Sequence, residues 1–168
     1  MSNDLSPPGW RKMIARPSKI ISGGQTGADR AALDAAIELG IAHGGWCPRG
    51  RRAEDGPIPA RYSLEETDSP EYAVRTELNI RGSDATLIVG EPPLSGGTAL
   101  TERLACRHGK PYLLISPSAA DEQAVATVRQ WLQAGKYTVL NVAGPRESQL
   151  PGIGRRTFEL LLAIFSDD

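Results

Sequence analysis

One segment near the start of the chain constrains the fold more than any other, because it joins an apolar run to a glycine-rich turn. It reads Ile20-Ile21-Ser22-Gly23-Gly24-Gln25-Thr26-Gly27-Ala28-Asp29-Arg30 and predicts a buried strand, a tight turn and the start of an alanine-rich helix. The first N–H groups of a helix have no partner within it and lie at the positive end of its dipole. The junction therefore predicts a phosphate site formed by Gly23, Gly24, Gln25, Thr26, Gly27, Asp29 and Arg30. The alternatives are a turn that holds no ligand and, for Asp29, a carboxylate that only stabilises the helix start.

A second junction of the same kind lies farther along the chain. The apolar run 85–89 leads into a glycine, and another helical pattern follows the residues Ser95, Gly96, Gly97 and Thr98. Two such junctions indicate one phosphorylated ligand. A third loop, 143–148, follows the last predicted strand and contributes Arg146, whose guanidinium group suits phosphate.

The spacing of the first glycines excludes two common nucleotide-binding motifs. A dinucleotide fingerprint needs G-x-G-x-x-G and an acidic residue about 20 positions further on. This chain has G-G-x-x-G, and the corresponding region holds Ile41, Ala42 and His43. The nucleoside-triphosphatase loop G-x-x-x-x-G-K-[ST] does not occur in the sequence. Ordinary NAD binding is therefore not expected, and ATP hydrolysis of that type is excluded.

Composition and charge narrow the class of protein. The 168 residues are 40% hydrophobic and 23% charged, which suits one domain with its own core. A net charge of −1 argues against general binding to nucleic acid or to a membrane surface. No apolar run is long enough to span a bilayer and residues 1–19 have no secretory core, so we expect a cytoplasmic protein. The cysteines and histidines show no metal-site spacing, and we expect no protein-ligated metal.

Arginine is concentrated in one loop-like stretch that is rich in proline and glycine. Arg49, Arg51, Arg52 and Arg61 fall within residues 47–68. The forked guanidinium group favours bidentate contacts to phosphate and carboxylate. A solvated loop in an arginine-rich chain explains the same residues equally well, so both interpretations stay open.

Apolar runs and helical patterns alternate along the chain and predict an α/β fold. Strands are expected at about 19–22, 41–46, 85–89, 111–115 and 138–142, and helices at about 28–39, 70–81, 99–108, 118–134 and 154–165. This alternation predicts a single domain over residues 18–168, a three-layer Rossmann-like fold with a mostly parallel five-stranded sheet. Residues 1–17 are expected to be a poorly ordered lead-in.

Local signals set some of these boundaries. Ser69 before Pro70 predicts a capped start for the second helix, and Ser118 with Asp121 has the spacing of a capping box for the fourth. Helical spacing in the last helix predicts a buried face made of Phe158, Leu161, Leu162 and Phe165.

The predicted sheet also gives the place of the site. In such sheets ligands bind beyond the carboxyl ends of the strands, where the strand order reverses. If the first strand and the strand at 85–89 are neighbours at that point, the loops 23–27 and 95–98 line one crevice. The loop 143–148 leaves the same edge. We therefore expect the three loops to converge.

Four separated motifs occur along the chain in a characteristic order: GGQTGADRAALD at 23–34, GWCPRGRRAEDG at 45–56, GGT at 96–98 and NVAGPRES at 141–148. Together they resemble the molybdenum-cofactor carrier family, over roughly residues 19–165. The resemblance implies a Rossmann-like fold, a homo-oligomer (dimer or tetramer) and a pocket for a phosphorylated pterin. Molybdopterin would be the cargo, and it would ligate molybdenum through its own dithiolene sulfurs.

The architecture is also similar to a wider nucleotide-handling superfamily that includes the cytokinin-activating nucleoside-monophosphate phosphoribohydrolases. Those enzymes use an arginine on the helix before the third strand and a glutamate after a P-G-G-x-G-T loop. This resemblance implies catalytic roles for Arg75 and Glu102. The match is imperfect, because Ser95 replaces the proline, the loop is shorter, and Glu102 is about one residue out of register. Ordinary helical ion pairs and the favourable place of an acid near a helix start explain the same two residues.

The function that the sequence favours is binding of a phosphorylated small molecule, as a carrier of the molybdopterin type rather than an enzyme. Hydrolysis of a nucleotide N-glycosidic bond is the alternative, and Arg75 and Glu102 are catalytic only under it. A module that senses a nucleotide derivative is a third possibility.

Overall fold

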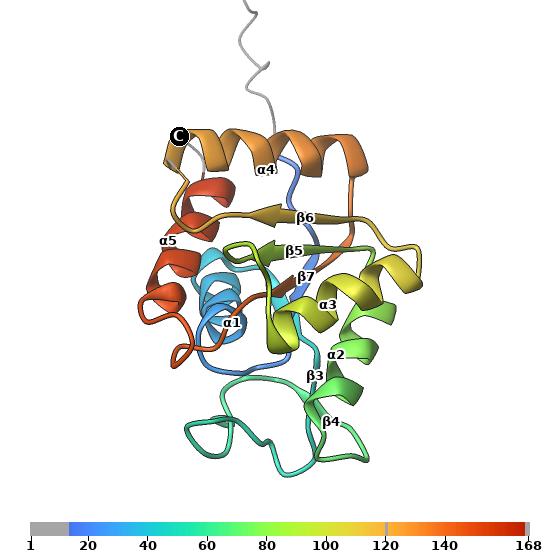
Figure 1. Ribbon diagram of the computed structural model, residues 1–168. Helices are drawn as coiled ribbons and strands as arrows, with labels where there is room; N and C mark the ends of the chain where they lie inside the picture. Colours follow the sequence, from blue (N-terminus) through green and yellow to red (C-terminus); the bar gives the residue numbers. More distant parts are fainter. Residues whose placement is uncertain (1–13, 120, 167–168) are drawn as a thin grey trace, which may run out of the picture.

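The computed structural model describes residues 14–119 and 121–166. Its elements, in chain order, are β1 (Lys19–Ile21), α1 (Ala28–Leu39), β2 (Ala42–Gly44), β3 (Trp46–Cys47), β4 (Glu65–Glu66), α2 (Tyr72–Arg81), β5 (Ala85–Val89), α3 (Gly96–Arg107), β6 (Tyr112–Ile115), α4 (Asp121–Gly135), β7 (Val139–Ala143) and α5 (Ile153–Phe165), as labelled in Figure 1. Residues 1–13 of the expected lead-in lie outside the described residues. The end of that segment contacts the domain, since Arg16 Nε donates to the Phe165 carbonyl at 3.1 Å.

The main sheet has the order β2-β1-β7-β5-β6, and all its strand pairs are parallel. The predicted α/β fold with a parallel five-stranded sheet is therefore confirmed. The strand order, which the sequence left open, does not make β1 and β5 neighbours, because β7 lies between them and pairs with both. Ile21 of β1 is in register with Asn141 of β7, and Ile88 of β5 is in register with Ala143. The loop that follows β7 consequently leaves the middle of the carboxyl edge.

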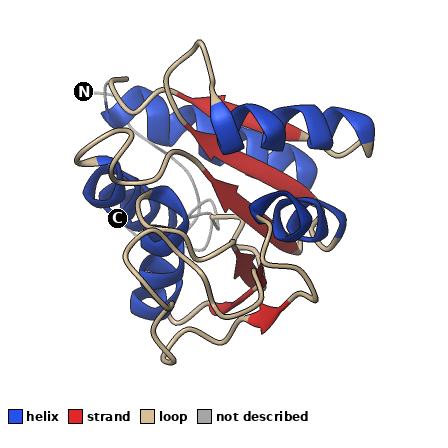
Figure 2. Cartoon of the chain, turned by 60° about the horizontal axis from the view of Figure 1, so that its bottom comes forward, coloured by secondary structure: helices blue, strands red, loops and turns tan. Residues whose placement is uncertain are grey.

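Helices cover both faces of this sheet and give the three layers that Figure 2 shows. On one face α1, α4 and α5 pack together over the larger core, which includes Leu87, Leu140 and Leu161. On the other face α2 and α3 pack against each other around Ile80 and Leu104. Among the described residues, no helix is both long enough and apolar enough to cross a membrane.

Two helix starts differ from the prediction in ways that matter for the site. The helix α2 begins at Tyr72, and Ser69 lies outside it, where its hydroxyl accepts a hydrogen bond from the Glu71 N–H at 3.1 Å. The helix α3 begins at Gly96 rather than near residue 99. The glycines of the second junction are therefore the first turn of the helix, and this turn faces the carboxyl edge of the sheet.

The last two helices also differ from the prediction. The helix α4 begins at Asp121, and the expected capping box is wrong because the Ser118 hydroxyl donates to the Glu91 carboxylate instead. The buried face of α5 is rotated from the expected one, since Phe158 and Leu162 are only half-buried. The residues that α5 buries are Ile153, Thr157, Leu160, Leu161, Ile164 and Phe165.

The long loop 48–64 is folded on itself below the sheet edge, with β3 and β4 paired in parallel at its ends (Figure 1). Its own small core contains Cys47, Ile58 and Tyr62, packed against Leu33 of α1. Arg51 holds the loop together by donating to the carbonyls of Ile58, Pro59 and Tyr62 at 2.8–2.9 Å. The loop is thus an ordered segment that packs against α1.

Candidate functional site

A pocket lies at the carboxyl edge of the central strands, beside α2 and α3. Residues from α1, α2, α3 and β7 and from the loops that follow β1 and β7 contribute to its wall. The residues that line it are Gly23, Gln25, Asp29, Arg75, Thr76, Asn79, Gly97, Thr98, Thr101, Asn141, Val142, Ala143, Gly144, Arg146 and Gln149. The three loops expected to converge do so, since each contributes residues to the pocket. The loop after β7 lies between the loops that follow β1 and β5, because β7 is the strand between those two.

Arg75 supplies a buried positive charge to this pocket. It projects from α2, is only 7% exposed, and donates from Nη1 to the Gly23 carbonyl at 2.7 Å and from Nε to Thr76 Oγ1 at 3.2 Å. A Cβ at Gly23 would lie 2.5 Å from the guanidinium, so the absence of a side chain there makes the approach possible. Burial lowers the pKa of Arg75, and the nearby Asp29 carboxylate opposes that shift. A guanidinium held in this way is oriented for an anion.

Gln25 supplies a buried donor whose orientation is fixed by the fold. Its Oε1 accepts hydrogen bonds from the Thr26 N–H at 3.1 Å and from the Glu54 N–H at 2.9 Å. The residue is 5% exposed, and its Nε2 has no hydrogen-bond partner among the described residues. Because Oε1 is already engaged by two donors, the amide cannot be reversed without breaking both bonds. A buried donor without a partner costs free energy, and a ligand oxygen in the pocket would satisfy it.

Asp29 places a carboxyl group in the same pocket, four residues after Gln25 on α1. It is 8% exposed, and removal from water raises its pKa to about 6. The charge of Arg75 and hydrogen bonds from the N–H groups of Gln25 and Gly23 oppose that rise. The pocket therefore combines a buried cation with an acid whose ionisation is disfavoured.

Two more N–H groups of this first turn have partners within the protein. Gly24 donates to Ser22 Oγ at 3.3 Å, and Ala28 donates to the Pro145 carbonyl at 3.2 Å. The turn consequently presents the side chains of Gln25 and Asp29 to the pocket rather than a row of free N–H groups.

The first turn of α3 forms the opposite side of the pocket. Gly97, Thr98 and Thr101 line it, and the Thr101 hydroxyl donates to the Gly97 carbonyl at 2.9 Å. A Cβ at Gly97 would meet no atom within 4 Å. Ser95 is the N-cap residue and Gly96 the first helical residue, and neither lines the pocket. This helix start is therefore open on the side where an anion would bind.

Aromatic and basic side chains gather around one ring at α2. The guanidinium carbons of Arg52, Arg75 and Arg146 lie 4.8, 5.2 and 5.3 Å from the centre of the Tyr72 ring. Arg146 is half-buried, and its Nη1 is 3.9 Å from Glu54 Oε2. Cations over an aromatic face are stabilised by the ring quadrupole. Three arginines in one place also favour an anionic ligand.

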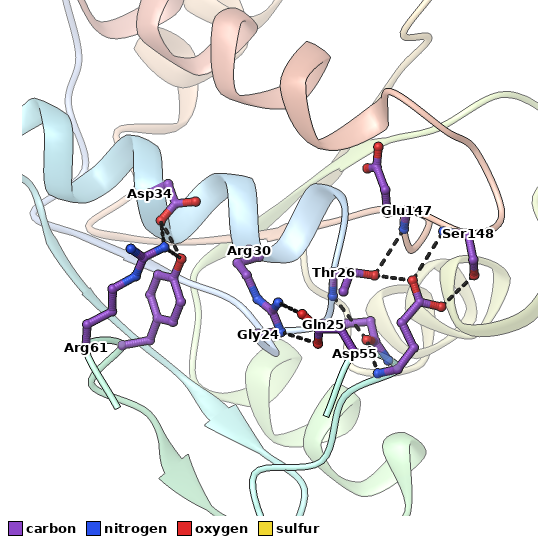
Figure 3. Close-up of polar contacts among 11 residues, drawn as sticks. Gly24, Gln25, Thr26, Arg30, Asp34, Asp55, Arg61, Glu147 and Ser148 are labelled. Carbon is purple, nitrogen blue, oxygen red and sulfur yellow. Dashed lines mark hydrogen bonds and ion pairs between the residues drawn. The ribbon is translucent and has the colours of Figure 1, made fainter. Parts of the chain in front are cut away.

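The outer side of the first turn contacts the 48–64 loop and the loop that follows β7 (Figure 3). Thr26 Oγ1 donates to the Glu54 carboxylate and accepts a hydrogen bond from the Glu147 N–H at 3.2 Å. Glu54 also accepts bonds from the N–H and the hydroxyl of Ser148, at 3.2 and 2.5 Å. The bonds from Ser148 and Thr26 lower the pKa of Glu54. These contacts fasten the turn to two loops.

Three more residues predicted to bind phosphate also face the protein. Arg30 forms an ion pair with Asp55 and donates to the Gly24 carbonyl at 3.1 Å (Figure 3). A Cβ at Gly24 would lie 2.6 Å from Leu64, and a Cβ at Gly27 would lie 2.4 Å from the Pro145 carbonyl oxygen. None of these three residues lines the pocket.

The two residues of the hydrolase alternative are not brought together. Arg75 lines the pocket, but Glu102 does not. Glu102 lies beside Tyr112, whose pKa is raised by Cys106, by removal from water and by the Glu102 charge. Thr101, one residue earlier on α3, lines the pocket instead. A threonine cannot take the role that the resemblance implies for a glutamate, and the hydrolase alternative is not favoured.

The arginines of the 47–68 stretch have different surroundings, so neither interpretation, anion binding or a solvated loop, holds for all of them. Arg49 donates to the Asp68 carbonyl at 3.0 Å, Arg51 holds loop carbonyls, and Arg61 contacts Asp34 and Tyr62. Only Arg52 reaches the basic cluster around Tyr72. Within residues 14–119 and 121–166, no group of histidine, cysteine or acidic side chains could hold a metal ion.

Sequence reasoning missed several polar residues of the pocket wall, among them Thr76, Asn79, Thr101, Asn141 and Gln149. Two of them had a signal. Thr101 follows Thr98 by three residues, which places both on one helix face. Asn141 is a polar residue inside an apolar strand, and its Nδ2 donates to Thr86 Oγ1 at 3.2 Å. A buried amide at the carboxyl end of a central strand indicates a site.

Comparison with known proteins agrees with this architecture. The crystal structure of a protein from Syntrophus aciditrophicus SB, named "Putative molybdenum carrier protein", is 46% identical in sequence with a TM-score of 0.87. The match covers 89% of this chain and 96% of that one. Comparison with curated proteins gives no match. The profile of the circularly permutated YpsA SLOG family matches residues 20–165, and the chain therefore belongs to that family.

Proposed function

We propose that the pocket binds the phosphate group of a small molecule and that the chain acts as a carrier of a molybdopterin-type cofactor. The observation that carries the proposal is the Gln25 amide. It is buried, its Oε1 is engaged twice, and its Nε2 has no partner among the described residues. A protein oxygen does not satisfy that donor, and a ligand oxygen would.

The neighbouring groups support phosphate as the source of that oxygen. Arg75 contributes a buried guanidinium, and the N–H groups of Gly97 and Thr98 lie at the start of α3. Helix starts and guanidinium groups both bind phosphate in proteins. Arg146 stands at the edge of the same pocket, where the rest of a phosphorylated ligand would leave it.

The molybdopterin part of the proposal has separate support. The similar protein of known structure is named for a molybdenum carrier. Such a cofactor bears its metal on its own sulfurs, so its binding site needs contacts to the phosphate and the pterin rather than a set of protein ligands. The pterin ring would lie beside Arg146, whose planar guanidinium group can stack on it.

Calorimetric titration tests the function. The chain should bind a phosphorylated pterin, and the dephosphorylated pterin should bind at least about tenfold more weakly because the contacts to the phosphate are lost. Gly97→Leu should abolish binding, because its side chain would enter the pocket from a position with no neighbour within 4 Å. The unfolding midpoint without ligand should stay unchanged in that variant. Equal affinity for the two pterins would contradict the proposal.

We also propose that the chain is cytoplasmic, as its composition indicates, and a homo-oligomer, as the resemblance implies. Ile37 on α1 is 47% exposed, and the half-buried Phe158 of α5 lies in the same surface hollow. Burial of this apolar pair between two copies would stabilise a dimer. Light scattering that gives the mass of one chain at micromolar concentration would contradict the assembly.

A further inference from the structure

Asp29 is the one carboxyl group among the residues that line the pocket. An acid is unexpected there, because the other groups favour a negative ligand. Arg75, Arg146 and the start of α3 attract an anion, whereas an ionised Asp29 repels it. The carboxyl group is not displaced toward solvent, since it is 8% exposed and accepts hydrogen bonds from the N–H groups of Gly23 and Gln25. Its position is therefore fixed by the fold.

A carboxyl group in an anion site distinguishes ligands by their protons. It accepts a hydrogen bond from a ligand oxygen that carries hydrogen, and it repels an oxygen that carries none. Inorganic phosphate keeps at least one proton near neutral pH, whereas sulfate and molybdate keep none. A hydroxyl group elsewhere on an organic ligand offers the same hydrogen.

We propose that Asp29 is a specificity-determining residue, which accepts a hydrogen bond from a ligand hydroxyl and excludes oxyanions that carry no proton. The inference rests on the proposed phosphate site and names the class of ligand that this site selects. The ligand is a phosphate compound with a hydroxyl on the phosphorus or close to it. Free molybdate is rejected, so any molybdenum enters this pocket as part of a phosphorylated organic molecule.

The surroundings of Asp29 support a shared proton. Burial holds its pKa at about 6, despite the opposing charges of Arg75 and Arg30. The second pKa of a phosphate monoester is also about 6. Two acids of similar strength in contact share one proton, which converts their repulsion into a hydrogen bond.

Calorimetric titration near neutral pH tests the inference with four probes: inorganic phosphate, sulfate, molybdate and ribose 5-phosphate. The wild-type chain should bind phosphate at least about tenfold more tightly than sulfate or molybdate. In Asp29→Asn the amide keeps the shape and can donate to an unprotonated oxygen. Sulfate and molybdate should then bind about as tightly as phosphate. Glu38→Gln is the control, because it removes the same charge from an exposed position on the same helix. It should leave the ratio of affinities unchanged.

The outcomes separate the inference from the function on which it rests. Equal affinity of the wild-type chain for all four probes, or tighter binding of molybdate than of phosphate, would overturn the inference alone. So would an unchanged ratio in Asp29→Asn. If ribose 5-phosphate binds more tightly than both inorganic ions and loses this advantage in Asp29→Asn, the hydroxyl is on the organic part and the inference stands. Binding of none of the probes would overturn the phosphate site itself, and the inference with it.

Discussion

The two glycine-rich junctions look alike in the sequence and differ in the folded protein. Each leads from an apolar strand through glycines into a helix, at residues 20–30 and 85–98. In the first, N–H groups donate to Ser22, Gln25, Asp29 and Pro145, and a Cβ at Gly27 would collide with backbone. In the second, a Cβ at Gly97 would meet nothing within 4 Å. The first junction is filled by the protein and the second is left open.

The one pocket uses the two junctions differently. In the first junction, backbone N–H groups bond to the side chains of Gln25 and Asp29 and hold them in place, and both residues line the pocket. Gln25 lies in the turn before α1 and Asp29 in its first helical turn. Thr26 and Arg30 do not line the pocket, and they fasten the turn to the 48–64 loop. The second junction offers its helix start directly to a ligand.

The largest expected difference between the two junctions is in stability, when one methyl group is added to each. Gly27→Ala should destabilise the fold by roughly 3 kcal/mol or more, because φ is +79° and the Cβ would lie 2.4 Å from the Pro145 carbonyl oxygen. Gly97→Ala should be neutral or stabilise by about 0.5–1 kcal/mol, because alanine favours the helix. Urea unfolding of both variants measures the difference. Equal losses of stability would show that the second junction is also filled.

Removal of the Asp29 charge should give the next largest effect, and it depends on pH. The folded pKa of Asp29 is raised from 3.8 to about 6, so the ionised form destabilises the fold. Stability from this group is complete below about pH 4 and is lost as pH rises through 6. Asp29→Asn should therefore stabilise the free protein by up to roughly 3 kcal/mol at pH 7 and by almost nothing at pH 4. Glu38→Gln, measured in parallel by urea unfolding, should show no such pH dependence. A stability loss in Asp29→Asn at pH 7 would contradict this account.

Much of the fold was predictable because the strands are short apolar runs bounded by glycine and proline. The run 85–89 was located to the residue, and the helix expected at about 28–39 is α1, Ala28–Leu39. Strand order was not predictable, since the place of β7 depends on which sheet edge its crossover reaches. The buried face of α5 was also misplaced, because several apolar residues in a row fit more than one helical face.

Several residues of the site were predicted, but which residues of the first turn face the pocket and which face the protein was not. Gly23, Gln25, Arg75 and Arg146 were identified from motif, charge and resemblance, and all line the pocket. The fixed orientation of Gln25 depends on the N–H of Glu54, a residue of the long loop. No periodicity links two residues that far apart. The side of the turn 23–27 that faces a ligand could therefore not be predicted without knowing where the 48–64 loop lies.

The contribution of Gln25 can be isolated by a change that keeps its acceptor role. Gln25→Glu retains an oxygen for the N–H groups of Thr26 and Glu54, and it replaces the Nε2 donor by a second oxygen. Affinity for inorganic phosphate should fall at least about tenfold, which corresponds to about 1.4 kcal/mol. Gln133→Glu adds the same charge at an exposed position on α4 and should change affinity little. Calorimetric titration compares the two, and equal affinities would remove Gln25 from the site.

The smallest expected effects come from replacing one threonine in each junction, Thr26 in the first and Thr98 in the second. Thr26→Val removes a hydroxyl that donates to Glu54 and accepts from the Glu147 N–H, so it should lower the free energy of unfolding by about 1 kcal/mol. It should leave phosphate affinity unchanged, because Thr26 does not line the pocket. Thr98→Val should do the reverse, weakening phosphate binding several-fold with little loss of stability, because Thr98 lines the pocket at the open helix start and the change removes a donor there. Urea unfolding and calorimetric titration of both variants give four numbers. If Thr26→Val weakened binding as much as Thr98→Val, the outer contacts of the first turn would be part of the ligand site, and the division between a filled and an open junction would fail.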